Sequence, residues 1–368
     1  MNKKFSIIIH PVNRALLYEY EPGMRQKPIE VSKKLLEWMS PFKVSNIEGI
    51  HSPGKTDVDG ELVMCPLLME QMLNLDPRKV FNKVKKAALF AEKRGSSLIS
   101  LAAYTAMVGN RGQKVAEAVS VPVTTGSHMS LASIPEALLK AMRILSYNVE
   151  KMNVLIFGTN IITLSVMDAI SRSAKKTWVY STNKVKTEAL FKNVPSFMKK
   201  RILPIFNYRS ILKDADIIVF ATNKIPLDFD TDQVKKGAII FDCSYPRKIA
   251  STRKDILIID GVTMRPPGNP KFKFNFGLPE GLCFPCMAEP ITLALENKWE
   301  SFSLGKDIKL KDAKDIFRRA LKQGFTIDKL TAHDTVIEDE EIDEVRESIK
   351  SNNSKSFLSN IYKIVKKR

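Results

Sequence analysis

The residue type and position best suited to chemistry in this sequence is Cys286, which comes just before helix-like text at 288–296. A helix N-terminus favours negative charge, so a thiol there ionises more readily and can attack a thioester. Cys283, three residues earlier, completes a C-x-x-C pattern. A small buried cysteine without chemistry is the alternative for Cys286, and Cys283 fits that alternative well. The sequence therefore offers one nucleophile candidate, at position 286.

The cysteines do not form a pattern typical of metal or disulfide chemistry. Four cysteines in a chain of 368 residues are too few for a disulfide framework. A zinc site at Cys283 and Cys286 would need a second pair of ligands, but Cys65 and Cys243 are isolated and the histidines are scattered. Pro285 between the two close cysteines disfavours a thioredoxin-like redox pair. We expect no metal.

A second candidate group is the segment 123–130, which is small and polar for a packed sheet. It follows strand-like text, so its side chains should lie at the end of a strand. Thr125, Ser127 and His128 are the residue types that orient a carbonyl group or a cofactor amide. Capping of the next helix by Ser127 explains the same text equally well.

A third candidate group follows the apolar run 153–157, where a dinucleotide pyrophosphate would bind backbone N–H groups. The loop reads Gly158-Thr-Asn-Ile-Ile-Thr-Leu-Ser165 and keeps only the first glycine of the G-x-G-x-x-G pattern. Asn160 adopts positive φ more readily than most residues, Thr159 lies beside it, and Ser165 can donate to a phosphate. The bulk of Ile161 and Leu164 opposes a close approach, so the loop alone leaves nucleotide binding open.

The end of the next strand normally selects between the two nicotinamide cofactors. Here the text reads Ser181, Thr182, Asn183 and Lys184, without an acidic residue. An acid would bind the ribose hydroxyl of NAD, whereas a basic residue accommodates the 2′-phosphate of NADP. If a dinucleotide binds, we therefore expect NADPH, with Thr182, Asn183 and Lys184 as contacts. An ordinary exposed turn is the alternative.

Alternating strand and helix patterns position these groups and predict an α/β fold. In the first half, strands at 5–10, 61–64, 97–102 and 121–124 alternate with helices at 30–39 and 77–93. A helix at 134–146, with Pro135 in its first turn, leads into the second half. There, five strands are expected at 153–157, 177–180, 216–220, 238–242 and 256–260. The second half therefore predicts a Rossmann-type, doubly wound parallel sheet.

We expect the following division of the chain. An α/β substrate domain spans 1–133, a connecting helix 134–149, and a Rossmann-like dinucleotide-binding domain 150–265. Residues 266–325 return to the substrate domain and carry Cys286, and 326–368 form a charged helical tail.

Composition limits the partners. Lys and Arg number 58 against 40 Asp and Glu, a formal charge of +18 that favours acidic partners such as anionic lipid or an acidic carrier protein. No nucleic-acid-binding motif is visible, so we expect no nucleic acid. The apolar run within 1–9 is too short for a signal peptide, and no apolar stretch is long enough to span a membrane. We therefore expect a cytoplasmic protein, with peripheral membrane contact left open. The oligomeric state cannot be inferred.

Several of these segments together resemble the long-chain acyl-[acyl-carrier-protein] reductases and related, predicted amino-acid- or shikimate-dehydrogenase-like oxidoreductases. The resemblance covers most of residues 5–325. Its most specific segments lie at 41–45 with 60–66, 124–128, 216–219, 242–247, and 284–289 with Trp299 and Gly305.

The resemblance implies NADPH-dependent reduction of a fatty acyl thioester, from acyl carrier protein or coenzyme A, to an aldehyde. The family nucleophile lies in a Phe-x-Cys-x-Ala-Glu motif that matches Cys286, which would carry the acyl group as a thioester. The family phosphate loop matches 158–165, and Tyr245 in the 242–247 segment would lie near the cofactor. Two alternatives remain: a dehydrogenase of a small carbonyl or amino-acid-like compound, and a non-catalytic relative that has lost the phosphate-binding glycines.

Overall fold

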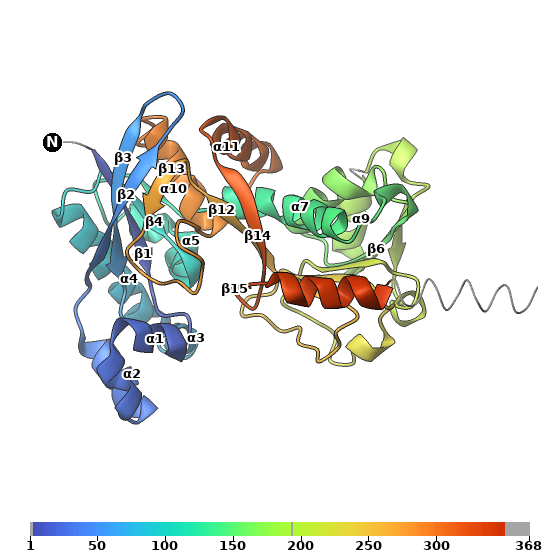
Figure 1. Ribbon diagram of the computed structural model, residues 1–368, viewed down its shortest axis with the longest axis horizontal. Coiled ribbons are helices and arrows are strands. Elements are labelled where there is room, and N and C mark those ends of the chain that lie inside the picture. Colours follow the sequence, from blue (N-terminus) through green and yellow to red (C-terminus); the bar gives the residue numbers. More distant parts are fainter. Residues whose placement is uncertain (1–2, 193, 350–368) are drawn as a thin grey trace, which may run out of the picture. The chain divides into compact units, whose positions relative to one another are not determined.

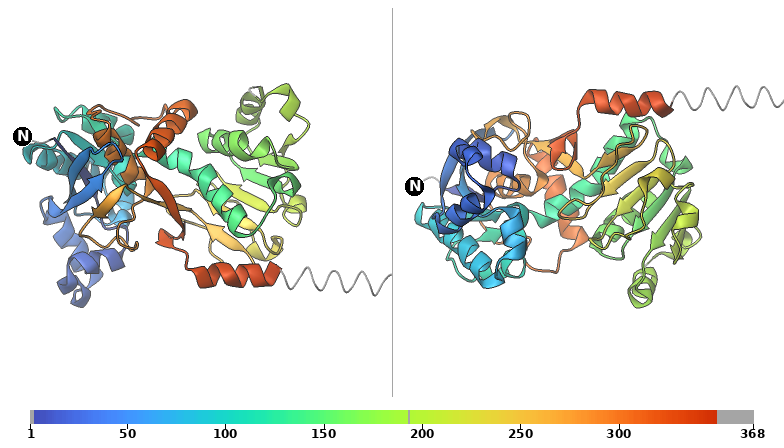
Figure 2. Two further views of the ribbon diagram at one scale, coloured as in Figure 1. Left: turned by 45° about the horizontal axis from the view of Figure 1, so that its top comes forward. Right: turned by 90° about the horizontal axis from the view of Figure 1, so that it is seen from below.

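The computed structural model describes residues 3–192 and 194–349, which fold into two compact units. Unit 1 comprises Met1–Ser133 and Thr263–Asp328, and unit 2 comprises Ile134–Val262 and Lys329–Arg368. In each unit, helices cover a β-sheet (Figures 1 and 2). No helix in the described part of the chain is both long and apolar enough to cross a membrane.

Unit 1 is built on a six-stranded sheet in the order β13-β2-β3-β1-β4-β5. The strands are β1 (Lys4–Ile9), β2 (Phe42–His51), β3 (Asp57–Met64), β4 (Leu98–Leu101), β5 (Val123–Thr124) and β13 (Gly268–Lys271). Its helices include α1 (Arg14–Tyr20), α2 (Ile29–Trp38), α3 (Met69–Asn74), α4 (Pro77–Lys93), α5 (Val108–Arg111), α6 (Gln113–Ala116), α10 (Pro285–Leu295) and α11 (Leu310–Lys322).

The core of unit 1 follows from the periodicities of its sequence. Helix α4 buries one stripe of small and branched residues, Val80, Val84, Ala87, Ala88 and Ala91, as its 3.6-residue period predicts. That stripe packs against buried residues of β1, β3 and β4. Because side chains alternate across a strand, the neighbouring residues of β1, β3 and β4 point to the other face, where α10 also contacts these strands.

The sheet of unit 1 is mixed, although the alternation of strands and helices in the first half of the sequence favours a parallel sheet. Strands β1, β3, β4 and β5 run parallel, but β2 is antiparallel to β3 and β13 is antiparallel to β2. The sequence of β2 gave a weak strand signal because polar residues and Gly49 interrupt it and most of its side chains are only half-buried.

Unit 2 contains a six-stranded, entirely parallel sheet in the order β11-β10-β9-β6-β7-β8. Its strands are β6 (Asn153–Phe157), β7 (Lys176–Tyr180), β8 (Ile202–Ile205), β9 (Ile217–Phe220), β10 (Ile239–Asp242) and β11 (Leu257–Ile259). The order runs outward in both directions from β6, which confirms the expected doubly wound, Rossmann-type fold. Strand β8 was not among the five predicted strands because Pro204 interrupts its pattern, which an edge strand tolerates.

Two helices begin earlier in the structure than the sequence predicts. Helix α7 (Ser127–Ile144) begins seven residues before the predicted start, so Pro135 lies inside it rather than in its first turn. Helix α10 begins at Pro285, so Cys286 lies within the first turn and not before it.

The predicted helical tail begins instead as strands, β14 (Thr326–Ala332) and β15 (Thr335–Val336), which form a small sheet with β12 (Gly261–Arg265). A helix then spans 339–349. The strands were missed because the charged composition of the segment concealed the alternation in Thr326–Ala332. The rest of the predicted tail, 350–368, lies outside the described residues.

Candidate functional site

The candidate site in unit 1 lies at the carboxyl ends of three neighbouring parallel strands. His10 follows β1, Ala103 follows Leu101 of β4 by two residues, and Thr125 follows β5. The carboxyl edge of a parallel α/β sheet is the usual place for a ligand, because loops from successive strands meet there. Helix α10 contributes its N-terminal turn to the same region, since Gly126 and Cys286 lie in direct contact.

Cys286 is half-buried beneath a loop that only glycine can form. Gly126 has φ of +69°, and a Cβ atom there would lie 2.4 Å from the Cα of Cys286 and 2.5 Å from its Cβ. Any larger residue would therefore push the loop away from the cysteine, in addition to straining the backbone. The segment Thr124 to His128 is thus packed against the candidate nucleophile.

Glu289, one turn beyond Cys286 on α10, holds this loop in place. Its carboxylate is fully buried and accepts hydrogen bonds from the backbone N–H groups of Gly126 and Met129, each at 3.0 Å. The hydroxyls of Thr124 and Ser303 also donate to it. Burial raises the pKa of Glu289 above its ordinary value, and the four donors oppose that rise. A buried carboxylate with a full set of donors makes this a rigid anchor.

His128 supports Glu289 through Ser303, and both of its ring nitrogens take part in hydrogen bonds. Its Nε2 accepts from the backbone N–H of Lys309 at 3.2 Å, and its Nδ1 lies 2.6 Å from the hydroxyl of Ser303. A neutral ring bonded in this way carries its proton on Nδ1 and donates to Ser303, which in turn donates to Glu289. Burial lowers the pKa of His128, which favours the neutral ring. This geometry supports a positioning role; contact with a substrate carbonyl stays a prediction.

Thr125 and Ser127 form a hydroxyl pair, with 2.7 Å between their oxygens. The hydroxyl of Thr125 also donates to the carbonyl of Ser303, so Ser127 is the donor within the pair. Thr125 is buried, whereas Ser127 is partly exposed and is therefore the member of the pair that a ligand can reach.

The ionisation of Cys286 differs from the sequence-based expectation. Burial is the main cause that raises the pKa of its thiol to about 11, and the charge of Glu289 acts in the same direction. The backbone N–H groups of Ala103, Cys286 and Met287 act in the opposite direction and favour the thiolate. The helix N-terminus therefore contributes as expected, but desolvation of the sulfur outweighs it.

The turn that brings Ala103 to this sulfur was not predicted from the sequence. Ala103 has φ of +51°, which is uncommon for a residue with a side chain. His10 holds the turn, because its Nε2 accepts from the N–H of Tyr104 at 3.1 Å while its Nδ1 lies 3.1 Å from the carbonyl of Pro11. Burial lowers the pKa of His10 to about 4, so the ring stays neutral. A buried histidine directly after a strand was the only available signal.

Cys283 has a structural position. It is fully buried, exchanges two backbone hydrogen bonds with Met264, and has a pKa raised by burial. Within the described residues, no three His, Cys, Asp or Glu side chains are grouped so that they could hold a metal ion.

In unit 2, the turn after β6 has the glycine that a dinucleotide site needs, but a side chain already accepts hydrogen bonds from the backbone N–H groups that follow it. Gly158 has φ of +116°, and a Cβ there would lie 2.6 Å from the carbonyl oxygen of Ala221. The Oδ1 of Asn160 accepts from the N–H groups of Ile162 and Thr163, at 2.9 and 3.3 Å. Its Nδ2 donates to Ala221. The amide thus takes the place that a phosphate oxygen would take at a helix N-terminus.

The other predicted cofactor residues of unit 2 differ in accessibility. Thr182, Asn183 and Lys184 are exposed after β7, and the ammonium of Lys184 lies 5.8 Å from the ring centroid of Phe206. Thr159 is partly exposed, but Ser165 is only 2% exposed within α8 (Ile161–Val166). A ligand at the turn could reach Thr159 but not Ser165 without rearrangement.

Tyr245 follows β10 and is held by Asn223. Its N–H donates to the Asn223 side chain at 3.0 Å, and its carbonyl accepts from the same amide. Because all six strands are parallel, the residues after β6, β7 and β10 lie along one edge of the sheet. The structure therefore places Gly158, Lys184 and Tyr245 on the edge where a dinucleotide binds in such folds.

By its sheet order and the glycine turn after β6, the chain is an α/β protein with a Rossmann-type unit. No family model matches it. It is 28% identical over 298 residues to the aminotransferase PigE of Serratia sp. (strain ATCC 39006), covering 78% of this chain and 34% of that protein. The chain thus spans about a third of the length of that relative.

Similar solved structures include shikimate dehydrogenase from Aquifex aeolicus, with 12% identity over 86% of this chain and 99% of that one, TM-score 0.34. The NAD-dependent malic enzyme from Thermotoga maritima is 12% identical over 88% of this chain and 85% of that one, TM-score 0.35. At these TM-scores neither likeness defines a substrate, and the resemblance to acyl-thioester reductases stays a prediction.

Proposed function

We propose that the chain reduces an acyl thioester to an aldehyde through an acyl group carried on Cys286. The observation that carries the proposal is the half-buried thiol in the first turn of α10, packed beneath a loop that requires glycine at 126. A buried carboxylate anchors that loop by two backbone hydrogen bonds. A cysteine of purely structural value, such as Cys283, needs no such surroundings.

The first half-reaction forms one carbon–sulfur bond and breaks another. The sulfur of Cys286 attacks the thioester carbonyl, and the thiol proton passes to the departing sulfur of the acyl donor, which is coenzyme A or a carrier protein. The sulfur attacks as a thiolate, which the N–H groups of Ala103, Cys286 and Met287 favour. The partly exposed hydroxyl of Ser127 would donate to the substrate carbonyl by turning its single hydrogen away from Thr125.

The second half-reaction reduces the carbonyl carbon. NADPH, when bound, would supply the hydride to the carbonyl carbon. The carbon–sulfur bond to Cys286 then breaks to release the aldehyde, and one solvent proton restores the Cys286 thiol. The balanced reaction converts thioester, NADPH and a proton to aldehyde, free donor thiol and NADP⁺. For this chain, the residues proposed to hold the dinucleotide are Gly158, Thr159, Thr182, Asn183, Lys184 and Tyr245, together with the backbone N–H groups that now donate to Asn160.

The residues of unit 2 fit a dinucleotide in part. The glycine turn and the exposed, acid-free end of β7 suit NADPH. The helix N–H groups, in contrast, are already bonded to Asn160. Asn160 is itself exposed, so its side chain can rotate into solvent and release those donors to a phosphate.

Two other functions each have one observation in their favour. The polar segment beside Cys286, with the partly exposed hydroxyl of Ser127, suits a small polar carbonyl or amino-acid-like substrate of a dehydrogenase. The capped turn at Asn160 suits a non-catalytic relative that does not bind the dinucleotide.

Turnover assays separate the three functions. Purified protein is incubated with NADPH and either palmitoyl-coenzyme A, palmitoyl-carrier protein or a panel of small keto acids and aldehydes, and both NADPH loss and products are measured. The proposal expects palmitaldehyde and free donor thiol in equal amounts, abolished in Cys286→Ala and retained in Cys283→Ala. Turnover of small substrates alone supports the dehydrogenase, and failure to bind NADPH supports the non-catalytic relative.

A further inference from the structure

Helix α2 in unit 1 leaves an apolar stripe exposed. Val31, Leu35 and Trp38 follow the i, i+4, i+7 spacing of one helix face and are 44%, 38% and 90% exposed. The opposite face is packed, since Leu36 is fully buried in a cluster with Leu17. Figure 1 shows α2 beside α1 and α3 in a lobe at one end of unit 1. Folding thus leaves the stripe available to an outside partner.

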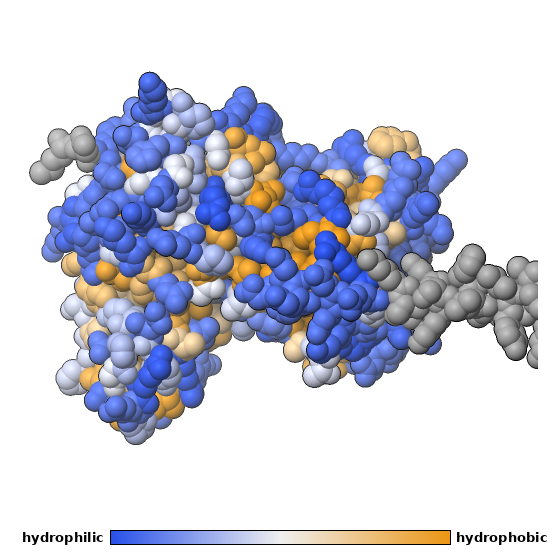
Figure 3. Space-filling model, in the orientation of Figure 1, coloured by the Kyte–Doolittle hydropathy of each residue, from blue (hydrophilic) through white to orange (hydrophobic). Residues whose placement is uncertain are grey.

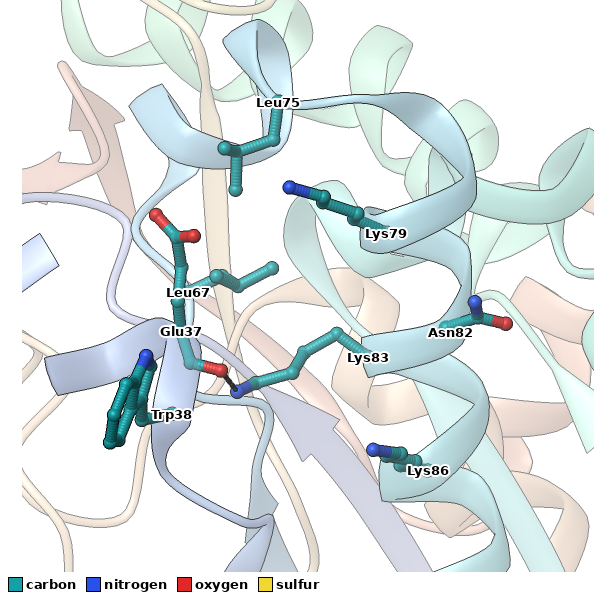
Figure 4. A pocket seen from close by; sticks show the side chains of 8 residues that line it. All are labelled: Glu37, Trp38, Leu67, Leu75, Lys79, Asn82, Lys83 and Lys86. Carbon is teal, nitrogen blue, oxygen red and sulfur yellow. Dashed lines mark hydrogen bonds between the residues drawn. The ribbon is translucent and has the colours of Figure 1, made fainter. Parts of the chain in front are cut away.

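Helix α4 places basic residues beside this stripe. Lys79, Lys83 and Lys86 line a hollow whose other wall includes Trp38 (Figure 4). The ammonium of Lys83 donates to the carbonyls of Leu36, Glu37 and Met39, at 2.8, 2.6 and 2.7 Å. Lys83 therefore closes the C-terminal end of α2 and fixes α2 against α4. The distance between the exposed indole and the basic face is consequently set by the fold.

The charges around the hollow remain positive after pairing. Glu37 also lines the hollow, and its carboxylate accepts from Gln71. Among the described residues, neither Lys79 nor Lys86 takes part in an ion pair, and Lys34 on α2 is likewise unpaired and exposed. In the space-filling view, apolar and polar surfaces lie next to each other on this lobe (Figure 3).

We propose that the surface formed by Val31, Leu35 and Trp38 with Lys34, Lys79 and Lys86 docks on an anionic phospholipid membrane. Tryptophan favours the interface between headgroups and acyl chains, where the ring is buried and its N–H stays hydrated. Lysines at the same level bind lipid phosphates through flexible stems. An acidic protein could also match the lysines, but a lysine-flanked apolar helix face that ends in a 90% exposed tryptophan is typical of a helix that lies in a membrane interface.

Tryptophan fluorescence tests this surface directly. The chain has three tryptophans. Trp178→Phe with Trp299→Phe therefore leaves Trp38 as the sole reporter. Adding vesicles of phosphatidylcholine with 30% phosphatidylserine should shift its emission to the blue, while pure phosphatidylcholine vesicles should shift it much less. The membrane shift should shrink as salt rises, because it depends on charge attraction.

Sedimentation with the same vesicles tests the surface in the unaltered chain. Trp38→Ala and the pair Lys79→Glu with Lys86→Glu should each lower the bound fraction at least fivefold. Exposed residues of unit 2 provide matched controls, namely Leu227→Ala and the pair Lys199→Glu with Lys200→Glu, which should sediment like the wild type.

No vesicle-dependent shift at Trp38, or equal sedimentation of Trp38→Ala and wild type, would overturn the proposal. If the chain does not bind vesicles but self-associates, and Trp38→Ala abolishes the self-association, the partner is a second copy of the chain and the membrane proposal is wrong. If it does not bind vesicles but binds an acidic carrier protein saturably, that protein is the partner and the membrane proposal is again wrong.

Discussion

The loop over Cys286 in unit 1 and the turn after β6 in unit 2 both donate backbone hydrogen bonds to a side chain, but the two side chains differ in charge and burial. Both lie at carboxyl ends of parallel strands, and both use a positive-φ glycine, Gly126 or Gly158, where backbones approach closely. In unit 1 the backbone N–H groups donate to the buried carboxylate of Glu289, and in unit 2 they donate to the exposed amide of Asn160.

This difference indicates which of the two regions is rigid and which can exchange the acceptor of its backbone hydrogen bonds. Hydrogen bonds to a charged group contribute about 1.5–3 kcal/mol each, and no solvent competes for the buried Glu289. An N-cap amide contributes about 1 kcal/mol, and water or a phosphate can replace an exposed one. We therefore expect changes in the unit 1 loop to remove function and changes at Asn160 to tune affinity.

The largest effect should come from adding a methyl group at Gly126. Gly126→Ala forces contacts far below van der Waals distance with Cys286, which should abolish its acylation and lower the free energy of unfolding by about 2–5 kcal/mol. Gly95→Ala is the matched control, because Gly95 also has positive φ but nothing lies within 4 Å of its Cβ position. Chemical denaturation and mass spectrometry of the acylated protein measure both quantities. Equal losses in the two variants would show that backbone strain, not the contact with Cys286, is responsible.

The second-largest effect should come from removing the carboxylate of Glu289. Glu289→Ala leaves four donors without their acceptor and should cost about 3–5 kcal/mol in the free energy of unfolding. Glu300→Ala, at an exposed position, should change it by less than about 0.5 kcal/mol. Urea denaturation compares the two. A loss below about 1 kcal/mol for Glu289→Ala would mean that the loop does not depend on the carboxylate.

The reactivity of Cys286 should depend steeply on pH. Its pKa of about 11 lies above the ordinary value of 9.0, so its thiolate fraction at pH 8 should be about a hundredfold below that of an ordinary thiol. Alkylation by iodoacetamide, followed by peptide mass spectrometry, should accelerate about tenfold per pH unit between pH 7 and 10. A rate that levels off near pH 8 would show that the helix N-terminus outweighs burial after all.

The smallest effect should appear at the exchangeable turn. Asn160→Gly frees the N–H groups of Ile162 and Thr163, and we expect the Kd for NADPH to fall several-fold with little change in stability, because glycine is a tolerable N-cap. Asn148→Gly, which removes another Asn cap in unit 2, should leave the Kd unchanged. Fluorescence titration of NADPH measures both. Weaker binding in Asn160→Gly would show that the amide itself contacts the cofactor.

The sequence predicted the fold better than the site. Helix α4 and strand β6 have their predicted bounds because each has a clear hydrophobic period. Strands β2 and β8 lack that period, and their places depend on neighbours far along the chain.

In the site, the sequence indicated Cys286 and the glycine-containing loop, but not what connects them. The roles of Glu289 and His10 depend on which backbone N–H groups tertiary folding places beside them. The raised pKa of Cys286 depends on burial, which no local pattern encodes.

The acyl group on Cys286 is the central claim, and a single-turnover mass measurement tests it most directly. Protein is mixed with excess palmitoyl-coenzyme A without NADPH, quenched in acid, and mapped by peptide mass spectrometry. The account predicts a palmitoyl group on the peptide containing Cys286, at that residue and not at Cys283, which disappears with release of palmitaldehyde when NADPH is added. A palmitoyl group absent from Cys286, or one that Cys286→Ala still acquires, would contradict it.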